Sequence, residues 1–262
     1  KVYVENDTAG NAKKPEHAKI LEAQSNFGLV FQDFNLFPHF SVLKNVMDAP
    51  VKNQKRPKQE VEKEARALLA KMGLEGKEDA YPHEFSGGMR QRVMIAIAFA
   101  CDPKILICDE PTTALDVTIQ GQILDIIKEL QREHNTSVIM ITHDLGVVAN
   151  IAQKIAVMYS GMIVERGNCE DIFYRPRHPY TWALIRSVPR LDLENKQVLA
   201  SIPGPPDLLN PPVGCPFCTR CEYCMEICKE QMPEVTEFGD GHEASCWLHH
   251  PLAPKVEMPG EA

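Results

Sequence analysis

Short apolar runs alternate with longer amphipathic stretches through the first two thirds of the chain. Each apolar run is too short for a helix and is bounded by turn residues, which is typical of a buried strand. The amphipathic stretches carry apolar residues at helical spacing. The pattern predicts strands at Phe27–Gln32, Lys104–Pro111 and Thr136–Asp144, and helices at Pro57–Gly73, Ser86–Pro103 and Thr118–His134. This alternation predicts a mostly parallel sheet covered on both faces.

The pattern changes toward the C-terminus. Residues 154–167, KIAVMYSGMIVERG, predict two strands joined at Ser160-Gly161. After about Pro189 the chain becomes rich in proline, which is typical of a linker. The domain organisation expected from these changes is an α/β domain over 1–190 with a helical subdomain at about 33–101, a Pro-rich linker over 191–214, a Cys-rich module over 215–250 and a polar tail over 251–262.

Composition excludes two classes of protein. The formal net charge of −8 leaves no basic excess to neutralise phosphates, so we expect no nucleic-acid partner. The longest apolar run, Val93–Cys101, is about half of the roughly 18 residues that span a bilayer. It predicts a buried helix, and any membrane-spanning part must come from a partner. The first residue is Lys and no signal peptide follows, so we expect an N-terminally incomplete chain.

Three places along this pattern carry candidate chemistry. The strand ILICDEP ends in Asp109 and Glu110, which could hold Mg²⁺ and polarise a water, or could be two solvated carboxylates. The turn at Ser86-Gly87-Gly88 opens a helix and could bind an anion, or could be an ordinary helix cap. His143 follows a strand and could contact a phosphate, or could be a structural histidine.

Five motifs follow one another in the order Gln32, FSGGMRQR, ILICDEP, TALD and ITHD. In this order and spacing, the chain resembles the nucleotide-binding domain of ATP-binding cassette (ABC) transporters over about residues 27–190. The motifs match the Q-loop, the signature, Walker B, the D-loop and the switch histidine of that family. The resemblance implies an α/β, P-loop NTPase-like ATPase that uses ATP and Mg²⁺.

The resemblance also implies a role for each matching residue. It implies Glu110 as general base, His143 at the γ-phosphate, Gln32 sensing Mg²⁺ and the γ-phosphate, Asp109 at Mg²⁺, Asp116 at a dimer interface, and Ser86, Gly87 and Gly88 on the γ-phosphate of ATP bound by a partner subunit.

One element of the family is missing from the 262 residues. They contain no G-x-x-x-x-G-K-[ST] phosphate loop (Walker A), which precedes the Q-loop in the family. KVYVENDTAG, residues 1–10, looks like the strand that follows the phosphate-loop helix. Because every other catalytic position is intact, we expect a truncation rather than a degenerate subunit. The chain alone is then expected to bind ATP poorly and to be inactive.

Two segments resemble different importer subfamilies. Residues 175–189, RPRHPYTWALIRSVP, and the proline-rich stretch after them resemble the C-terminal extension of oligopeptide and dipeptide importer ATPases. Residues 28–50 look more like the polar amino acid importers. The chain therefore looks mixed, and the peptide class is favoured because its match is longer.

Six of the nine cysteines lie between Cys215 and Cys246. The clustering suggests a local metal site rather than a framework of disulfides. The peptide-importer resemblance selects Cys215, Cys221, Cys228 and Cys246, a set associated in some members with a [4Fe–4S] cluster. Spacing alone selects Cys218, Cys221, Cys224 and Cys228, as in bacterial ferredoxins. Tetrahedral Zn²⁺ on four of the six stays an alternative.

The function expected from these observations is an ATP-hydrolysing subunit of an oligopeptide or dipeptide importer. Its expected partners are a second ATPase subunit, two transmembrane permease subunits and, indirectly, an extracytoplasmic peptide-binding protein. Its expected place is the cytoplasmic face of the cell membrane. The alternatives are an amino acid importer ATPase, an iron–sulfur protein with a vestigial nucleotide fold, and a non-catalytic subunit that offers only its signature.

Overall fold

The computed structural model describes residues 17–113, 115–188, 202, 204 and 212–256. The chain divides into two compact units, which meet in the sequence between His143 and Asp144. The first unit contains α1 (His17–Ser25), β1 (Phe27–Val30), α2 (Val42–Lys52), α3 (Lys58–Lys71), η1 (Pro82–Glu84), α4 (Gly87–Phe99), β2 (Ile105–Asp109), α5 (Val117–His134) and β3 (Ser137–Ile141). The expected strand in residues 1–10 lies outside the described residues.

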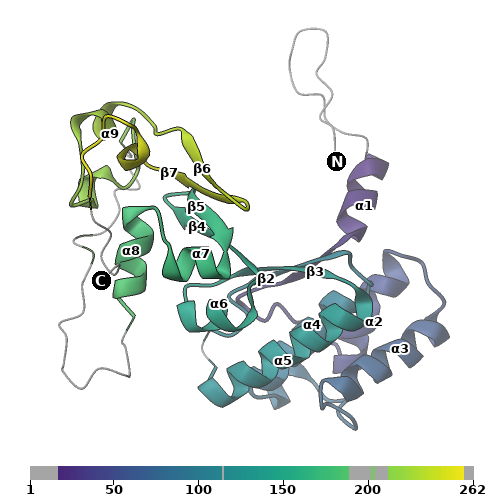
Figure 1. The fold of residues 1–262 in the computed structure, drawn as a ribbon. Helices are drawn as coiled ribbons and strands as arrows, with labels where there is room; N and C mark the ends of the chain where they lie inside the picture. The colour runs from purple at the N-terminus through teal and green to yellow at the C-terminus, as the bar shows by residue number, and fades with distance from the viewer. Residues whose placement is uncertain (1–16, 114, 189–201, 203, 205–211, 257–262) are drawn as a thin grey trace. The chain divides into compact units, whose positions relative to one another are not determined.

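The first unit is built on a three-stranded parallel sheet in the order β1-β2-β3. Helices α4 and α5 lie on the same side of this sheet (Figure 1). Val30, Leu106 and Cys108 are buried on that side, whereas Phe27 and Ile139 are about half exposed on the other. Within the described residues of the first unit, only one face of the sheet packs against helices, so the expectation of a sheet covered on both faces is not met there.

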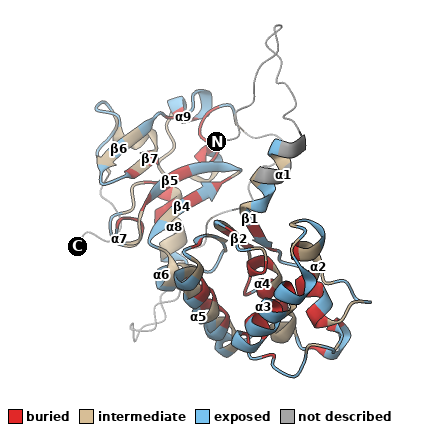
Figure 2. Ribbon diagram, turned by 90° about the vertical axis from the view of Figure 1, so that its right-hand side faces the viewer, coloured by how far each residue is buried: buried red, intermediate tan, exposed pale blue. Residues whose placement is uncertain are grey.

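The predicted helices of this unit are confirmed to within a few residues. Helix α4 is buried around most of its circumference, as the run Val93–Cys101 predicts, while α3 and α5 mix buried and exposed residues (Figure 2). Helix α2, which contains Pro50, was not predicted as an individual helix but lies within the helical subdomain expected at about 33–101. It forms because Ser41 caps its first turn and its buried Asn45 bonds the backbone of Phe37. No helix in the described residues is long and apolar enough to cross a bilayer.

The second unit contains an antiparallel sheet in the order β4-β5-β7-β6. Its elements are α6 (Leu145–Ile151), β4 (Lys154–Tyr159), β5 (Met162–Asn168), α7 (Cys169–Tyr174), α8 (Pro179–Arg186), η2 (Cys218–Arg220), α9 (Glu226–Glu230), β6 (Val235–Gly239), β7 (His242–Ser245) and η3 (Trp247–His249).

The predicted hairpin of β4 and β5 is confirmed, with positive φ at Ser160 and Gly161. Strand β7 pairs with β5 in the register Glu165↔Ala244. The structure thus groups the Cys-rich segment with the hairpin, because backbone pairing joins the two across the proline-rich stretch.

A buried carboxylate holds this unit together. The Glu165 side chain is fully buried, and its two oxygens accept hydrogen bonds from the backbone N–H groups of Arg177 and His178, at 2.6 and 2.9 Å. His242 Nε2, on β7, lies 2.9 Å from Glu165 Oε1. One side chain of β5 therefore fixes both the start of α8 and the position of β7.

Replacing Glu165 with Ala should strongly destabilise the second unit, because three buried partners lose their acceptor. We expect a loss of about 3–5 kcal/mol in the free energy of unfolding. Both tryptophans, Trp182 and Trp247, lie in this unit, so urea unfolding followed by tryptophan fluorescence reports it selectively.

The matched control is Glu243→Ala on β7, which removes a partly exposed carboxylate that pairs with the exposed Arg166. Its unfolding midpoint should stay close to that of the unchanged chain. Equal effects of the two substitutions would contradict a central role for the buried carboxylate.

Candidate functional site

The candidate catalytic residues follow the carboxyl ends of three neighbouring parallel strands. Gln32 follows β1, Glu110 directly follows β2, and His143 follows β3. Because the strands are parallel, their carboxyl ends meet at one edge of the sheet, which is where ligands bind in open α/β sheets. The sheet therefore collects side chains that are more than a hundred residues apart in the sequence.

These three side chains contact one another through the carboxylate of Glu110. His143 Nδ1 lies 2.9 Å from Glu110 Oε1, and Gln32 donates from Nε2 to Oε2 at 3.4 Å. The hydroxyl of Thr113 donates to the same Oε2 at 2.8 Å. The side chain of His143 is 73% exposed and that of Glu110 25%, so solvent reaches the pair.

The backbone of Glu110 is held in an unusual conformation. Its φ is +47°, in the left-handed region that non-glycine residues seldom adopt. The Glu110 N–H donates to the carbonyl of Ile141 on β3 at 2.9 Å, and its carbonyl accepts from the Thr113 N–H at 3.2 Å. These bonds hold the turn that directs the carboxylate toward His143, and strain of this kind is common at functional sites.

The surroundings of Glu110 also keep it ionised. The hydrogen bond with His143, and then that from Thr113, hold the pKa of the Glu110 carboxyl below its usual range. At neutral pH the group is a carboxylate, with lone pairs available to accept a proton from a water. This arrangement is suited to general-base chemistry.

The turn at Ser86 forms the N-terminus of α4, as predicted. The Ser86 hydroxyl accepts from the Met89 N–H at 3.4 Å, so it caps the helix. A Cβ placed on Gly88 would lie 2.8 Å from Cγ2 of Ile119, whereas one on Gly87 would meet nothing closer than 3.6 Å. Gly88 is thus required where α4 packs against the start of α5. The structural interpretation of this turn holds, and the exposed Ser86 side chain is open to solvent as well.

The two remaining acidic candidates lie at the C-terminal end of β2 and at the start of α5. Asp109 is the last residue of β2 and is partly buried. Asp116 caps α5, where Oδ1 accepts from the Ile119 N–H at 2.9 Å. Both aspartates belong to the first unit, together with Gln32, Glu110 and His143.

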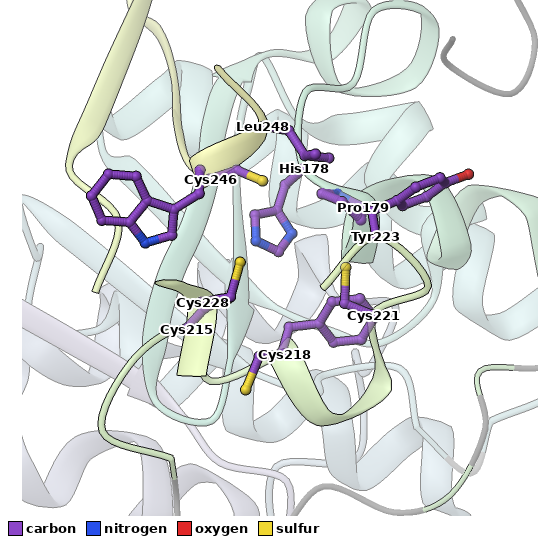
Figure 3. A pocket seen from close by; sticks show the side chains of 11 residues that line it. His178, Pro179, Cys215, Cys218, Cys221, Tyr223, Cys228, Cys246 and Leu248 are labelled. Atoms are coloured by element: carbon purple, nitrogen blue, oxygen red, sulfur yellow. The ribbon is translucent and has the colours of Figure 1, made fainter. Parts of the chain in front are cut away.

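All nine cysteines are free thiols, and five of the clustered six line one pocket in the second unit. Figure 3 shows labelled cysteines from separate segments around the imidazole of His178. The remaining lining is largely apolar. The cysteines that line the pocket are Cys215, Cys218, Cys221, Cys228 and Cys246.

Electrostatic interactions show which of the six clustered thiols lie near one another. Burial, with a smaller contribution from Cys215, Cys221 and Cys228, raises the pKa of Cys246 to about 12. These four thiols are therefore neighbours. Cys224 interacts with Cys228, Cys218 and Cys221, and its thiol donates to the Met225 carbonyl. The four thiols of the peptide-importer set thus lie near one another and line the pocket, whereas Cys224 of the ferredoxin-spaced set is not among the lining residues.

The arrangement of the possible metal ligands bears on which of the expected metal groups this pocket could hold. Among the described residues, no three His, Cys, Asp or Glu side chains are arranged to hold a metal ion. A single tetrahedral Zn²⁺ needs such a group, so the zinc alternative finds no support here. The same finding leaves the iron–sulfur cluster without a preformed site, and only the donor chemistry favours it: five cysteines line the pocket, and such a cluster takes cysteine thiolates.

His178 contributes a buried imidazole to this pocket. The residue is 1% exposed, and burial followed by the nearby His249 lowers its pKa to about 3. Its Nδ1 accepts from the Tyr180 N–H at 3.0 Å, which caps α8. Its Nε2 is buried and has no hydrogen-bond partner. An orphaned buried nitrogen beside gathered thiols fits a pocket that takes a further group.

Sequence reasoning missed Thr113 and His178. Thr113 lies three residues after Glu110 in a turn, and a Thr in a turn gives no sequence signal that it bonds a catalytic side chain. For His178 a partial signal exists, because a Pro at the first helical position marks the preceding residue as an N-cap. That signal predicts the role of Nδ1 and says nothing of Nε2.

Two family models match this chain. The model described as "ABC transporter" matches residues 4–113, and the one described as "Oligopeptide/dipeptide transporter, C-terminal region" matches residues 164–228. Together they match part of each unit.

Curated relatives agree with the two models. The oligopeptide transport ATP-binding protein OppD of Bacillus subtilis is 52% identical over 88% of this chain and 66% of its own length. The dipeptide transport ATP-binding protein DppD of the same organism is 46% identical over 91% and 72%. OppD of Escherichia coli is 48% identical over 89% and 70%. The chain thus spans about two thirds of the length of the relatives it matches.

A solved structure agrees as well. CbiO1 of Clostridium perfringens, described as part of the ABC transporter complex cbiONQ, is similar with a TM-score of 0.57 and 31% identity. The similarity covers 63% of this chain and 66% of that one.

Removing the Thr113 hydroxyl should raise the pKa of Glu110, because a donor to its charged form is lost. We expect Thr113→Val to raise it and His143→Ala to raise it further, since the His143 bond is the larger cause. Thr113→Ser keeps the hydroxyl and should leave the pKa unchanged. The measurement is an NMR titration of glutamate labelled with ¹³C at the carboxyl, with Glu110→Gln identifying the signal. An unchanged pKa in both deletion variants would contradict the hydrogen-bond account.

Proposed function

Because the chain belongs to the oligopeptide/dipeptide ATP-binding subunits of the ABC transporter family, we propose that it hydrolyses ATP to power the import of oligopeptides or dipeptides. The observation that carries the proposal is the convergence of Gln32 and His143 on the Glu110 carboxylate. The peptide class rests on the C-terminal match at residues 164–228 and on the names of the relatives.

In the proposed reaction, Glu110 accepts a proton from the attacking water, whose oxygen forms a bond to the γ-phosphorus while the bond to the ADP oxygen breaks. Glu110 is ionised at neutral pH, so its carboxylate can accept this proton. His143 and Gln32 hold the carboxylate now and would contact the γ-phosphate when ATP is bound. Mg²⁺, held through Asp109, would supply positive charge against the phosphate oxygens.

Ser86, Gly87 and Gly88 are proposed to contact the γ-phosphate of ATP on a second ATPase subunit, with Asp116 at the interface between the two. Ser86 and Asp116 are exposed, and the first-turn N–H groups of α4 offer an anion site. We further propose that two permease subunits hold this pair at the cytoplasmic face of the membrane, and that a separate binding protein delivers the peptide.

Replacing Glu110 with Gln in the assembled transporter should remove turnover but leave ATP binding intact. The amide keeps the shape of the side chain and cannot accept the proton, so we expect kcat to fall by about a hundredfold to ten-thousandfold. The control is Glu129→Gln, an exposed glutamate on α5. Proteoliposomes that accumulate labelled di- and oligopeptides with added ATP provide the assay.

The outcomes separate the rival functions. Unchanged turnover in the Glu110→Gln transporter would support a non-catalytic subunit. Accumulation of polar amino acids in place of peptides would support the amino acid importer that residues 28–50 resemble. A redox-active protein without ATPase activity would support the iron–sulfur alternative.

We propose that Cys215, Cys221, Cys228 and Cys246 bind a [4Fe–4S] cluster. The mutual proximity of the four thiols and the orphaned His178 Nε2 support this proposal. When bound, such a cluster would cross-link three segments of the second unit and could exchange one electron.

The two cysteine sets predict opposite results for two substitutions. After anaerobic reconstitution with Fe²⁺ and sulfide, Cys246→Ser should lose most of the bound iron and sulfide, whereas Cys224→Ser should retain them. Cys101→Ser, in the first unit, is the control. The reverse result would assign the ferredoxin-spaced set, and an iron-free unsubstituted chain would exclude the cluster.

A further inference from the structure

The pocket in the second unit has one polar group whose bonding capacity is unused. His178 Nε2 is buried without a partner, although the residue is 1% exposed. A buried N–H that lacks an acceptor costs about 1–3 kcal/mol. Native structures seldom keep such a group unless something else satisfies it.

The hydrogen bond at the opposite ring nitrogen determines what Nε2 can do. Because Nδ1 accepts from the Tyr180 N–H at 3.0 Å, its lone pair is in use and the ring proton resides on Nε2. A protonated Nε2 cannot bind a metal ion, since it has no lone pair to give. It can only donate a hydrogen bond.

The ring has little freedom to turn away. Its backbone N–H is held by the buried carboxylate of Glu165 at 2.9 Å, and Pro179 follows it at the start of α8. Rotating the ring would break the cap on α8. The imidazole therefore stays among the cysteines that line the pocket (Figure 3).

The acceptor has to be a group that the pocket can offer. Its walls are apolar side chains, five cysteines and Tyr223, whose hydroxyl points away from the imidazole in Figure 3, so sulfur is the side-chain acceptor around the ring. A neutral thiol accepts weakly, whereas a thiolate or inorganic sulfide carries negative charge and accepts well.

We propose that His178 donates a hydrogen bond from Nε2 to an anionic sulfur of an iron–sulfur cluster bound in this pocket. This inference rests on the proposed cluster. His178 is then a positioning residue that tunes the cluster without binding iron. Hydrogen bonds to cluster sulfurs favour the more negative, reduced state and so raise the reduction potential.

The test compares His178→Asn with His250→Asn in the full chain, reconstituted anaerobically with Fe²⁺ and sulfide. Asn is a good helix cap, so it can replace the Nδ1 acceptor while removing the Nε2 donor. His250 is exposed and does not line the pocket. We expect equal iron and sulfide in all three proteins, a more negative reduction potential in His178→Asn, and an unchanged potential in His250→Asn.

A second measurement does not depend on the substituted chain. Pulsed EPR of the reduced, unsubstituted protein with ¹⁵N-labelled histidine should show coupling of the cluster to a histidine nitrogen and to an exchangeable proton. If His178→Asn fails to fold or to bind iron, this spectrum decides, and absence of both couplings overturns the inference.

The remaining outcomes are distinct. A fully loaded His178→Asn protein with an unchanged potential overturns the role of His178 and leaves the cluster standing. An unsubstituted chain that binds no iron or sulfide overturns both. An assembled transporter that accumulates peptides with ATP but contains no iron or sulfide would show that the proposed transport function does not depend on either.

Discussion

The parallel register of β1, β2 and β3 is the constraint on which the catalytic geometry depends. Pairing of Ile105 with both Phe27 and Ser137 aligns the three strands, so that their carboxyl ends coincide. A shift by one residue would turn Glu110 to the opposite face of the sheet. The close approach of α4 to β1 depends on Gly28, because a Cβ on that residue would lie 2.8 Å from the Ala98 carbonyl. The packing that buries the sheet also fixes the site.

The second unit depends on one buried carboxylate in a comparable way. Glu165 anchors the backbone at Arg177 and His178 and contacts His242, so the strand order and the start of α8 are set together. The aromatic rings of Tyr159, Tyr180 and Phe217 pack beside the cysteines. The cysteine pocket is therefore a product of tertiary contacts across the unit and not of local cysteine spacing.

Sequence reasoning succeeded where the pattern was long and local. Strands β1 to β3 and helices α3 to α5 have clear periods, and the residues that follow each strand could be named as candidates. It failed where partners are distant. Glu165 lies in VERG, where a charged residue predicts exposure, yet it is fully buried because its partners lie up to 77 residues away. The bond from Thr113 to Glu110 depends on a turn with positive φ, which composition does not reveal.

Ser86 and Asp116 cap helices and are also proposed to contact a partner subunit. Because they have both roles, a movement at the partner can be transmitted to the helices that they cap. The Ile119 N–H donates to the Asp116 carboxylate. The Cγ2 of Ile119 lies so close to Gly88 that any side chain at position 88 would clash with it. Asp116 and Gly88, both proposed to face a partner subunit, are thus joined through one residue. Packed interiors have low compressibility. A movement of α4 toward the ATP of the partner subunit would therefore displace the start of α5 as well. Thr112, whose carbonyl accepts from Gln120 on α5, continues this connection to the turn that carries Glu110.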